Sequence, residues 1–189
     1  YANPLSGLPG NVPINEYIKM ALEQKRDSTV CYVDLDNFKP YNDIYGYEKG
    51  DKVILETARI LIDASDDKAH FVGHLGGDDF IVIFENGDSE QRCQAIHDHF
   101  AQLHPSLYNT KHLLAQGIEA QDRHGNTRFF PLISLSIGMV KLRDFSTLKT
   151  EAELSKHATI AKSLAKKITG NSLYRLNPVD YIHAQAQEA

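Results

Sequence analysis

Ser28-Thr29-Val30-Cys31-Tyr32-Val33 runs directly into Asp34-Leu35-Asp36-Asn37-Phe38-Lys39. The first half is short, β-branched and aromatic, which predicts a buried strand that ends at Asp34. A second acidic segment, Leu75-Gly76-Gly77-Asp78-Asp79-Phe80, lies between strand-like runs at 70–74 and 80–84. It predicts a hairpin with Asp78 and Asp79 at its tip. If the hairpin and the first strand are neighbours in one sheet, Asp34 and Asp78 converge on one point.

The composition narrows the class of protein. The chain has 189 residues, 42% of them apolar and 24% charged, which fits one folded domain and argues against disorder. No run approaches the roughly 20 apolar residues that a transmembrane helix needs. The net charge of −5 gives no basic surface for nucleic acid. We therefore expect a soluble domain that binds no polynucleotide.

The cysteines and the first residue of the chain bear on where the protein is located and on whether it is part of a longer one. Cys31 and Cys93 fall on apolar faces and are interpreted as reduced core thiols, so we expect a cytoplasmic location, as a free protein or as the cytosolic part of a membrane-attached one. The chain starts at Tyr1 without an initiator methionine, which predicts a piece of a longer protein.

The remaining elements complete an α/β pattern. Amphipathic helices are predicted from Asn11, after Gly46 and Gly50, from Ser89, and over 154–168. Runs 113–120 and 129–140 flank a turn at 122–126 and predict a second hairpin, and 173–176 predicts a last strand. The order αβαββαββαβ indicates an α+β fold: a single mixed, partly antiparallel sheet flanked by helices, with a ferredoxin-like core. We expect the domain to span 1–177 and a tail to follow at 178–189.

The chemistry follows from the two acidic segments. Carboxylates of Asp34 and Asp78 with the carbonyl of Leu35 make a hard-oxygen site suited to Mg²⁺ or Mn²⁺. A pair of such ions stabilises both oxygens of an in-line displacement at phosphorus. Gly76 and Gly77 let the backbone approach a ligand closely. These features indicate phosphoryl or nucleotidyl transfer, although either segment alone is more often an ordinary turn or a solvated strand end.

Several motifs together resemble one family. The chain from Leu5 to about Asn171 is similar to the GGDEF domain through Leu5-Ser6-Gly7-Leu8-Pro9, Asp34–Lys39, Asn42-Asp43, Gly46, Gly50-Asp51, Gly76-Gly77-Asp78-Asp79-Phe80 and Ser136-Ile137-Gly138. The resemblance implies a diguanylate cyclase, which condenses two GTP into cyclic di-GMP and two pyrophosphates at a transient homodimer interface with two divalent ions per site. It implies a fold like that of nucleotide cyclases and polymerase palms. The sequence Gly76-Gly77-Asp78-Asp79-Phe80, together with Phe130-Pro131-Leu132 and Ser134-Leu135-Ser136, also resembles GGDEF domains that are attached to EAL phosphodiesterase domains.

The resemblance also implies roles. Asp34, the Leu35 carbonyl and Asp78 would bind metal. Asp79 takes the position of a family Glu that helps deprotonate the ribose 3′-hydroxyl or touches the second metal.

Other residues would bind GTP. Asn42 and Asp51 would recognise guanine, Lys39 and Lys166 would neutralise phosphate charge, and Phe38, Gly76 and Gly77 would lie against the nucleotide. Without the resemblance, Asn42 and Asp43 are interpreted as turn formers, Asp51 as a helix cap and Lys166 as a solvated side chain.

Departures from the family pattern leave an alternative open. Asp79 is one methylene shorter than the usual Glu, His74 replaces a common Arg, and no Arg follows Gly170. The segment 67–70 lacks the Arg-x-x-Asp pattern, which predicts no product inhibition there. The alternative is a catalytically weak or silent GTP-binding domain that regulates an attached phosphodiesterase; a plain interaction scaffold is a third possibility.

Overall fold

The computed structural model describes residues 1–65, 70–85 and 87–189, and its centre is a five-stranded mixed sheet. The strands lie in the order β2-β3-β1-β6-β7, with bounds β1 Thr29–Asp36, β2 Phe71–Gly76, β3 Asp79–Phe84, β6 Ser134–Lys141 and β7 Ser172–Arg175. All neighbours are antiparallel except β6 and β7, which are parallel. The mixed α/β sheet predicted from the sequence is confirmed. The segment 67–69, on which the product-inhibition prediction depends, lies outside the described residues.

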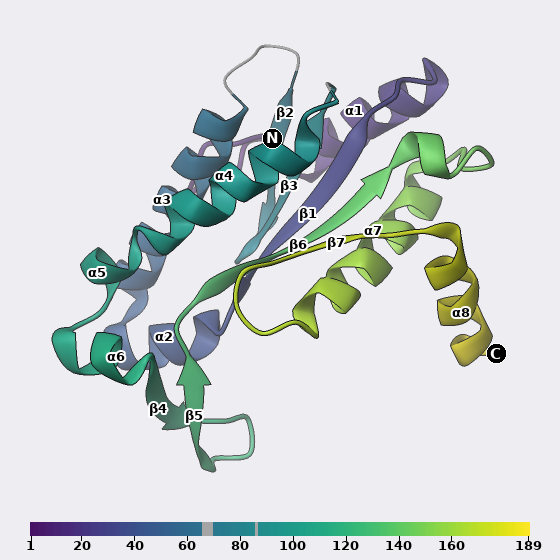
Figure 1. The fold of residues 1–189 in the computed structure, drawn as a ribbon. Coiled ribbons are helices and arrows are strands. Elements are labelled where there is room, and N and C mark those ends of the chain that lie inside the picture. Colours follow the sequence, from purple (N-terminus) through teal and green to yellow (C-terminus); the bar gives the residue numbers. More distant parts are fainter. Residues whose placement is uncertain (66–69, 86) are drawn as a thin grey trace.

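Helices cover both faces of the sheet (Figure 1). On one face α3 (Tyr47–Ala64) and α4 (Ser89–Ala101) pack on Cys31, Val33 and Leu35 of β1. On the other, α1 (Asn11–Glu23) and α7 (Glu151–Lys166) pack on a core that contains Val30, Ile81 and Val140. Alternate strand residues point to opposite faces, so Asp34, Asp36 and Asp79 continue the rows that face α7.

The first strand is longer than predicted. We expected it to end at Asp34, but β1 continues to Asp36 because β6 pairs with it as far as Ser134, opposite Asp36. Both acids of the Asp34-Leu35-Asp36 segment are therefore held by strand pairing.

A helix that the sequence did not predict follows β1. Helix α2 spans Phe38–Tyr45, and α3 begins at Tyr47, so Gly50 and Asp51 lie inside a helix. The interpretations of Asn42 and Asp43 as turn formers and of Asp51 as a helix cap are therefore wrong. Helix α3 starts at Tyr47, directly after Gly46, whose φ of 91° interrupts the helical backbone, while buried Gly50 provides room for Asn42.

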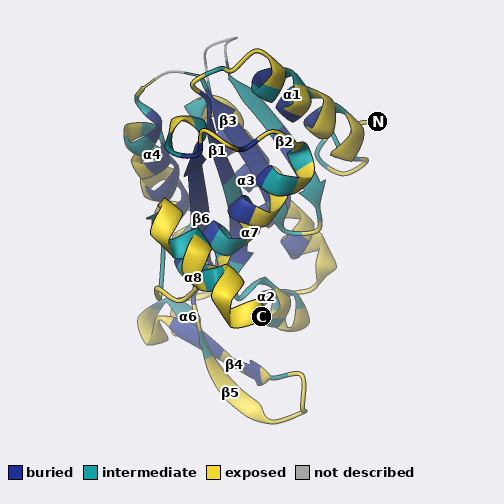
Figure 2. Ribbon diagram, turned by 90° about the vertical axis from the view of Figure 1, so that its right-hand side faces the viewer, coloured by how far each residue is buried: buried dark blue, intermediate teal, exposed yellow. Residues whose placement is uncertain are grey.

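The second hairpin differs from its prediction. It consists of β4 (Gly117–Gln121) and β5 (Thr127–Pro131), which form a separate two-stranded sheet at one end of the molecule (Figure 2). Residues 113–115 belong to helix α6 (Thr110–Ala115), and the predicted strand 129–140 is split between β5 and β6. The split occurs at Ile133, whose N–H donates to Tyr108 Oη at 2.8 Å and whose carbonyl accepts from His104 Nε2 at 2.7 Å, next to α5 (His104–Leu107).

The C-terminal residues form helix α8 (Pro178–Glu188), which begins with a capping box between Asn177 and Asp180. The ring of Tyr181 stacks on His157 of α7 at 3.8 Å, so α8 lies against the domain, although most of it is exposed (Figure 2). The boundary at residue 177 stays a prediction. Among the described helices, none combines the length and apolar character required to cross a bilayer.

Candidate active site

Strand pairing brings the two acidic segments together. Asp34 of β1 lies opposite Asp79 of β3, and the N–H of Leu35 donates to the carbonyl of Asp78 at 3.3 Å. Asp78 thus occupies the turn between β2 and β3, directly beside the end of β1. The sequence prediction that β1 and the hairpin are neighbours is confirmed.

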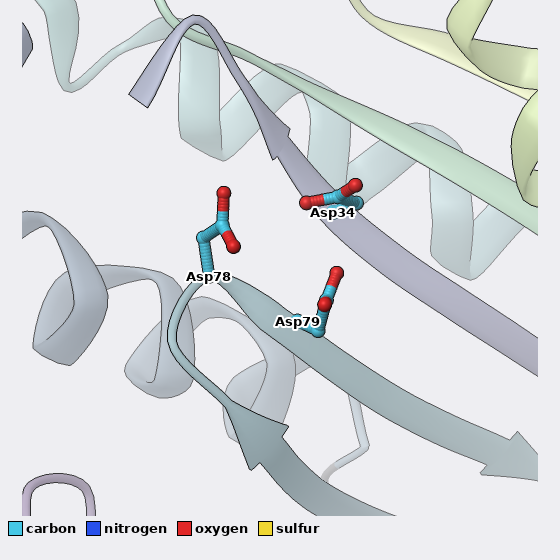
Figure 3. A group of neighbouring side chains, drawn as sticks. All are labelled: Asp34, Asp78 and Asp79. Carbon is cyan, nitrogen blue, oxygen red and sulfur yellow. The ribbon is translucent and has the colours of Figure 1, made fainter. Parts of the chain in front are cut away.

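Three carboxylates, Asp34, Asp78 and Asp79, form what we call the acidic cluster (Figure 3). One oxygen from each lies within 4.8 Å of the others. Asp34 is buried, whereas Asp78 and Asp79 are partly exposed.

The charges in the cluster interact strongly. Burial, and then the charge of Asp79, raise the pKa of Asp34 to about 6, although Lys166 opposes the shift. Burial and the charge of Asp34 raise the pKa of Asp78. A divalent cation among these oxygens would relieve the repulsion, and an all-oxygen set suits Mg²⁺ or Mn²⁺. The buried Asp79 Oδ1 makes no hydrogen bond within the described part of the chain, and its charged neighbour is Lys162 Nζ at 3.5 Å.

Two lysines of α7 balance this charge. Lys166 Nζ lies 2.9 Å from Asp34 Oδ2 and 3.0 Å from Asp36 Oδ1. Burial alone would lower the pKa of Lys166, but the hydrogen bond to Asp34 and the charges of Asp34 and Asp36 raise it. Lys162 Nζ lies 3.5 Å from Asp79 Oδ1 and 3.8 Å from Asp34 Oδ2. Interpreting Lys166 as merely a solvated side chain is therefore wrong.

Asp36 belongs to a different group of contacts. It accepts hydrogen bonds from the hydroxyls of Ser134 and Ser136, each at 2.7 Å, besides the contact with Lys166.

A hollow of about 300 Å³ beside Asp36 is lined by Ser134, Lys166 and Gly170. A larger hollow of about 570 Å³, between α1 and the 3-10 helix Leu142–Asp144, is lined by no residue of the acidic cluster.

The turn at Gly76 and Gly77 is held in place by the side chain of His74. Gly76 and Gly77 have φ of 140° and 52°, conformations that a residue with a side chain rarely adopts. His74 is buried, stacks on Phe80, donates from Nε2 to the Gly77 carbonyl at 2.9 Å and accepts from the Ser6 hydroxyl at 2.8 Å. The residue that departs from the family Arg therefore supports the turn that carries Asp78.

The predicted guanine-binding residues lie on the α2 and α3 pair. Asn42 is partly buried, and its Oδ1 has no hydrogen-bond partner within residues 1–65, 70–85 and 87–189. Asp51 is exposed on α3, one residue after Gly50. An unpaired buried acceptor fits the exocyclic amino group of guanine.

Phe38 and Lys39 begin α2. Phe38 is partly buried against the core, whereas the exposed Lys39 forms an ion pair with Asp43 at 2.8 Å. The structure thus brings Asp34, Leu35, Asp78, Asp79 and Lys166 together, and it places Lys39, Asn42 and Asp51 on neighbouring helices.

Sequence reasoning missed Lys162 and the serine pair that holds Asp36. Both have a signal in the sequence. Lys162 is four residues before Lys166 and therefore on the same helix face, and Ser134 and Ser136 are two apart on a strand.

Comparison with known proteins gives a consistent result. The family "Diguanylate cyclase, GGDEF domain" matches residues 1–172. A diguanylate cyclase of Vibrio cholerae is 35% identical over 98 residues, which cover 50% of this chain and 30% of that protein. The bifunctional diguanylate cyclase/cyclic di-GMP phosphodiesterase MucR of Pseudomonas aeruginosa is 26% identical over 148 residues, which cover 74% of this chain and 22% of MucR. The chain thus spans less than a third of the length of these curated relatives.

Solved structures share the fold. The GGDEF domain of TpbB (YfiN) from Pseudomonas aeruginosa superposes with a TM-score of 0.69 at 22% identity and covers 98% of this chain and 99% of that one. The GGDEF domain of DgcB from Caulobacter crescentus, solved in complex with c-di-GMP, gives 0.62 at 18% identity and covers 92% and 94%. Likeness at this level of identity establishes the fold alone.

Proposed function

The chain belongs to the GGDEF domain family of diguanylate cyclases, and on that premise we propose that it condenses two GTP into cyclic di-GMP and two pyrophosphates. Enzymes of this family use GTP, depend on divalent metal and act as dimers. The single observation that most supports this proposal is the acidic cluster, because three converging carboxylates beside a glycine turn would suit a metal-bound triphosphate.

We propose the following roles for the metal-binding side of the site. Asp34, the Leu35 carbonyl and Asp78 would hold Mg²⁺ or Mn²⁺, two ions per site, which supply stabilisation for the attacking and leaving oxygens. Asp79 accepts the proton of the ribose 3′-hydroxyl or contributes to the second ion. Lys166, which pairs with Asp34 and Asp36, would balance the charge of the triphosphate when these carboxylates hold metal.

We propose that the remaining residues orient the nucleotide. Asn42 Oδ1 accepts from the amino group of guanine, and the Asp51 carboxylate accepts from N1–H and the amino group. Lys39 is 77% exposed and can turn from Asp43 towards phosphate. Gly76, Gly77 and Phe38 line the path of the ribose and phosphates. Two such sites must face each other, because each 3′-hydroxyl attacks the α-phosphate held by the other copy.

The cellular compartment and the flanking domains are also matters of proposal. We propose that the domain works in the cytoplasm, free or as the cytosolic part of a membrane-attached protein. Flanking regulatory or EAL-type domains would bring two copies together. Solved neighbours include an EAL/GGDEF domain protein from M. capsulatus, which fits this arrangement.

The test is direct synthesis. Purified protein with GTP and Mg²⁺ or Mn²⁺, over a range of protein concentrations, is expected to form cyclic di-GMP, whereas Asp34→Asn is expected to form at least about 100-fold less. Saturable GTP binding without product, even with a dimerising tag, would instead support the silent regulatory domain. Failure to bind GTP in the presence of metal would support a scaffold.

A further inference from the structure

We propose that Lys162 is a positioning residue of the acidic cluster, which holds the carboxylate of Asp79 against β1. This inference rests on the proposed function, because it concerns the same site. It assigns to Lys162 a task distinct from that of Lys166, which lies one helical turn further along α7.

The contacts separate the two lysines. Lys162 Nζ lies between Asp79 Oδ1 at 3.5 Å and Asp34 Oδ2 at 3.8 Å, so it bridges β3 and β1. Lys166 binds Asp34 and Asp36 instead. The Lys162 side chain is 24% exposed, which makes its interaction less screened by solvent than a surface ion pair. For Asp79, Lys162 is the one ion-pair partner in the part of the chain that the structure describes.

The fold fixes where Lys162 lies. Helix α7 packs on β6 at Gly138, where an added Cβ would come within 2.3 Å of the Lys162 backbone nitrogen. Gly138 lies opposite Tyr32 of β1, and Ala161 and Ala165 are completely buried on either side. Because no side chain separates helix from strand, the Lys162 side chain can reach across to both acidic strands.

Asp79 needs such a partner. Its side chain is one methylene shorter than the Glu usual at this position, and it lies opposite the buried carboxylate of Asp34. The two carboxylates have oxygens within 4.8 Å of each other, so their negative charges repel. An Asp79 side chain that was free to rotate would therefore turn towards solvent. The ammonium group of Lys162 counteracts that repulsion and keeps Asp79 Oδ1 inside the cluster.

The test uses Lys162→Met, which keeps the unbranched apolar stem and removes the charge. Removing a cation beside the cluster is expected to tighten Mn²⁺ binding, measured by electron paramagnetic resonance without nucleotide, by about fivefold. Cyclic di-GMP formation at saturating metal and GTP is expected to fall about tenfold, because Asp79 is no longer held in place. General damage to the fold would weaken both, so the opposite directions identify a positioning role.

Two further variants complete the experiment. In an Asp79→Asn background, Lys162→Met is expected to change the rate by less than about twofold, since the partner is already gone. Lys156→Met, an exposed lysine on the same helix, is expected to leave metal affinity and rate unchanged. Weaker Mn²⁺ binding, an unchanged rate, or an equal loss in the Asp79→Asn background overturns the proposal. If the wild type makes no cyclic di-GMP, the proposed function fails, but the Mn²⁺ measurement still tests the Lys162 contact.

Discussion

Single side chains in this site are held by their neighbours rather than by their own local sequence. Asn42 lies against Gly50, where an added Cβ would come within 1.7 Å of Asn42 Oδ1. Glycine inside a helix costs about 0.5–1 kcal/mol relative to alanine, so its place in α3 is explained by the room that it leaves for Asn42. The absence of a side chain at Gly50 therefore decides where the Asn42 amide, which is proposed to recognise guanine, can lie.

Gly50→Ala is expected to weaken GTP binding about tenfold (1.4 kcal/mol), because the new methyl group displaces the Asn42 amide. The free energy of unfolding is expected to change by less than about 1 kcal/mol, since the Asn42 side chain can move to another rotamer and alanine favours the helix. Binding of inosine triphosphate, which lacks the amino group that Asn42 is proposed to accept from, is expected to change much less. Calorimetric titration with both nucleotides measures the difference.

The control for this substitution is Gly87→Ala, because an added Cβ there meets no atom within 4 Å. It is expected to leave both affinities unchanged. Equal affinities of the Gly50→Ala protein and the wild type for GTP would show that Asn42 does not recognise the guanine.

At the level of helices and strands, the sequence predicted what local pattern determines. The first strand, the glycine hairpin and the helix over 154–168 have clear periodicity, and all three are present. Helix α2 was missed because Asn42, Asp43 and Gly46 are typical of turns. The break at Ile133 depends on contacts with Tyr108 and His104, and the position of Lys162 on the closeness of α7 to β6, so neither could be predicted from local sequence.

Another contact between elements predicts a pH effect. His97 of α4 is buried and donates from Nε2 to the carbonyl of Leu135 on β6 at 3.1 Å. Burial lowers the pKa of His97, despite that hydrogen bond, so the unfolded chain takes up a proton at a higher pH than the folded one. The stabilisation is therefore present above about pH 6.5 and is lost as pH falls through the lowered pKa.

His97→Gln, which can still donate to Leu135, is expected to lose less free energy of unfolding than the wild type between pH 7.5 and 5.5. The difference in slope is at most about 1.4 kcal/mol per pH unit, the limit for one proton. Asp34 acts in the opposite sense, because its raised pKa of about 6 makes stability fall as pH rises, but it is present in both proteins. Urea unfolding at several pH values in metal-free buffer measures the slopes, and exposed His99→Gln is the control. Parallel slopes for wild type and His97→Gln would contradict this assignment.

For the whole molecule, the position of the site governs assembly. The acidic cluster lies near the C-terminal end of β1 and beside the hairpin turn, and two of its three carboxylates, Asp78 and Asp79, are partly exposed (Figure 3). One copy can present one GTP there, and the proposed reaction forms two bonds between two nucleotides. The rate should therefore depend on pairs of competent copies rather than on single ones.

Mixing wild type with Asp34→Asn at constant total concentration tests this dependence. If both copies must supply a competent site, the rate follows the square of the wild-type fraction, so an equal mixture is expected to retain about one quarter of the activity. A domain that works alone would retain about one half.

The dependence on the square of the wild-type fraction holds whether dimers are rare or saturated, provided that the two proteins pair at random and that Asp34→Asn keeps its fold. Circular dichroism and GTP binding check the fold of the variant. Replacement of Asp34 by the isosteric amide is expected to leave the sheet intact, because Lys166 keeps Asp36 and Lys162 keeps Asp79 as ion-pair partners. A linear dependence would rule out the requirement that both copies supply a competent site, even if the acidic cluster proves essential.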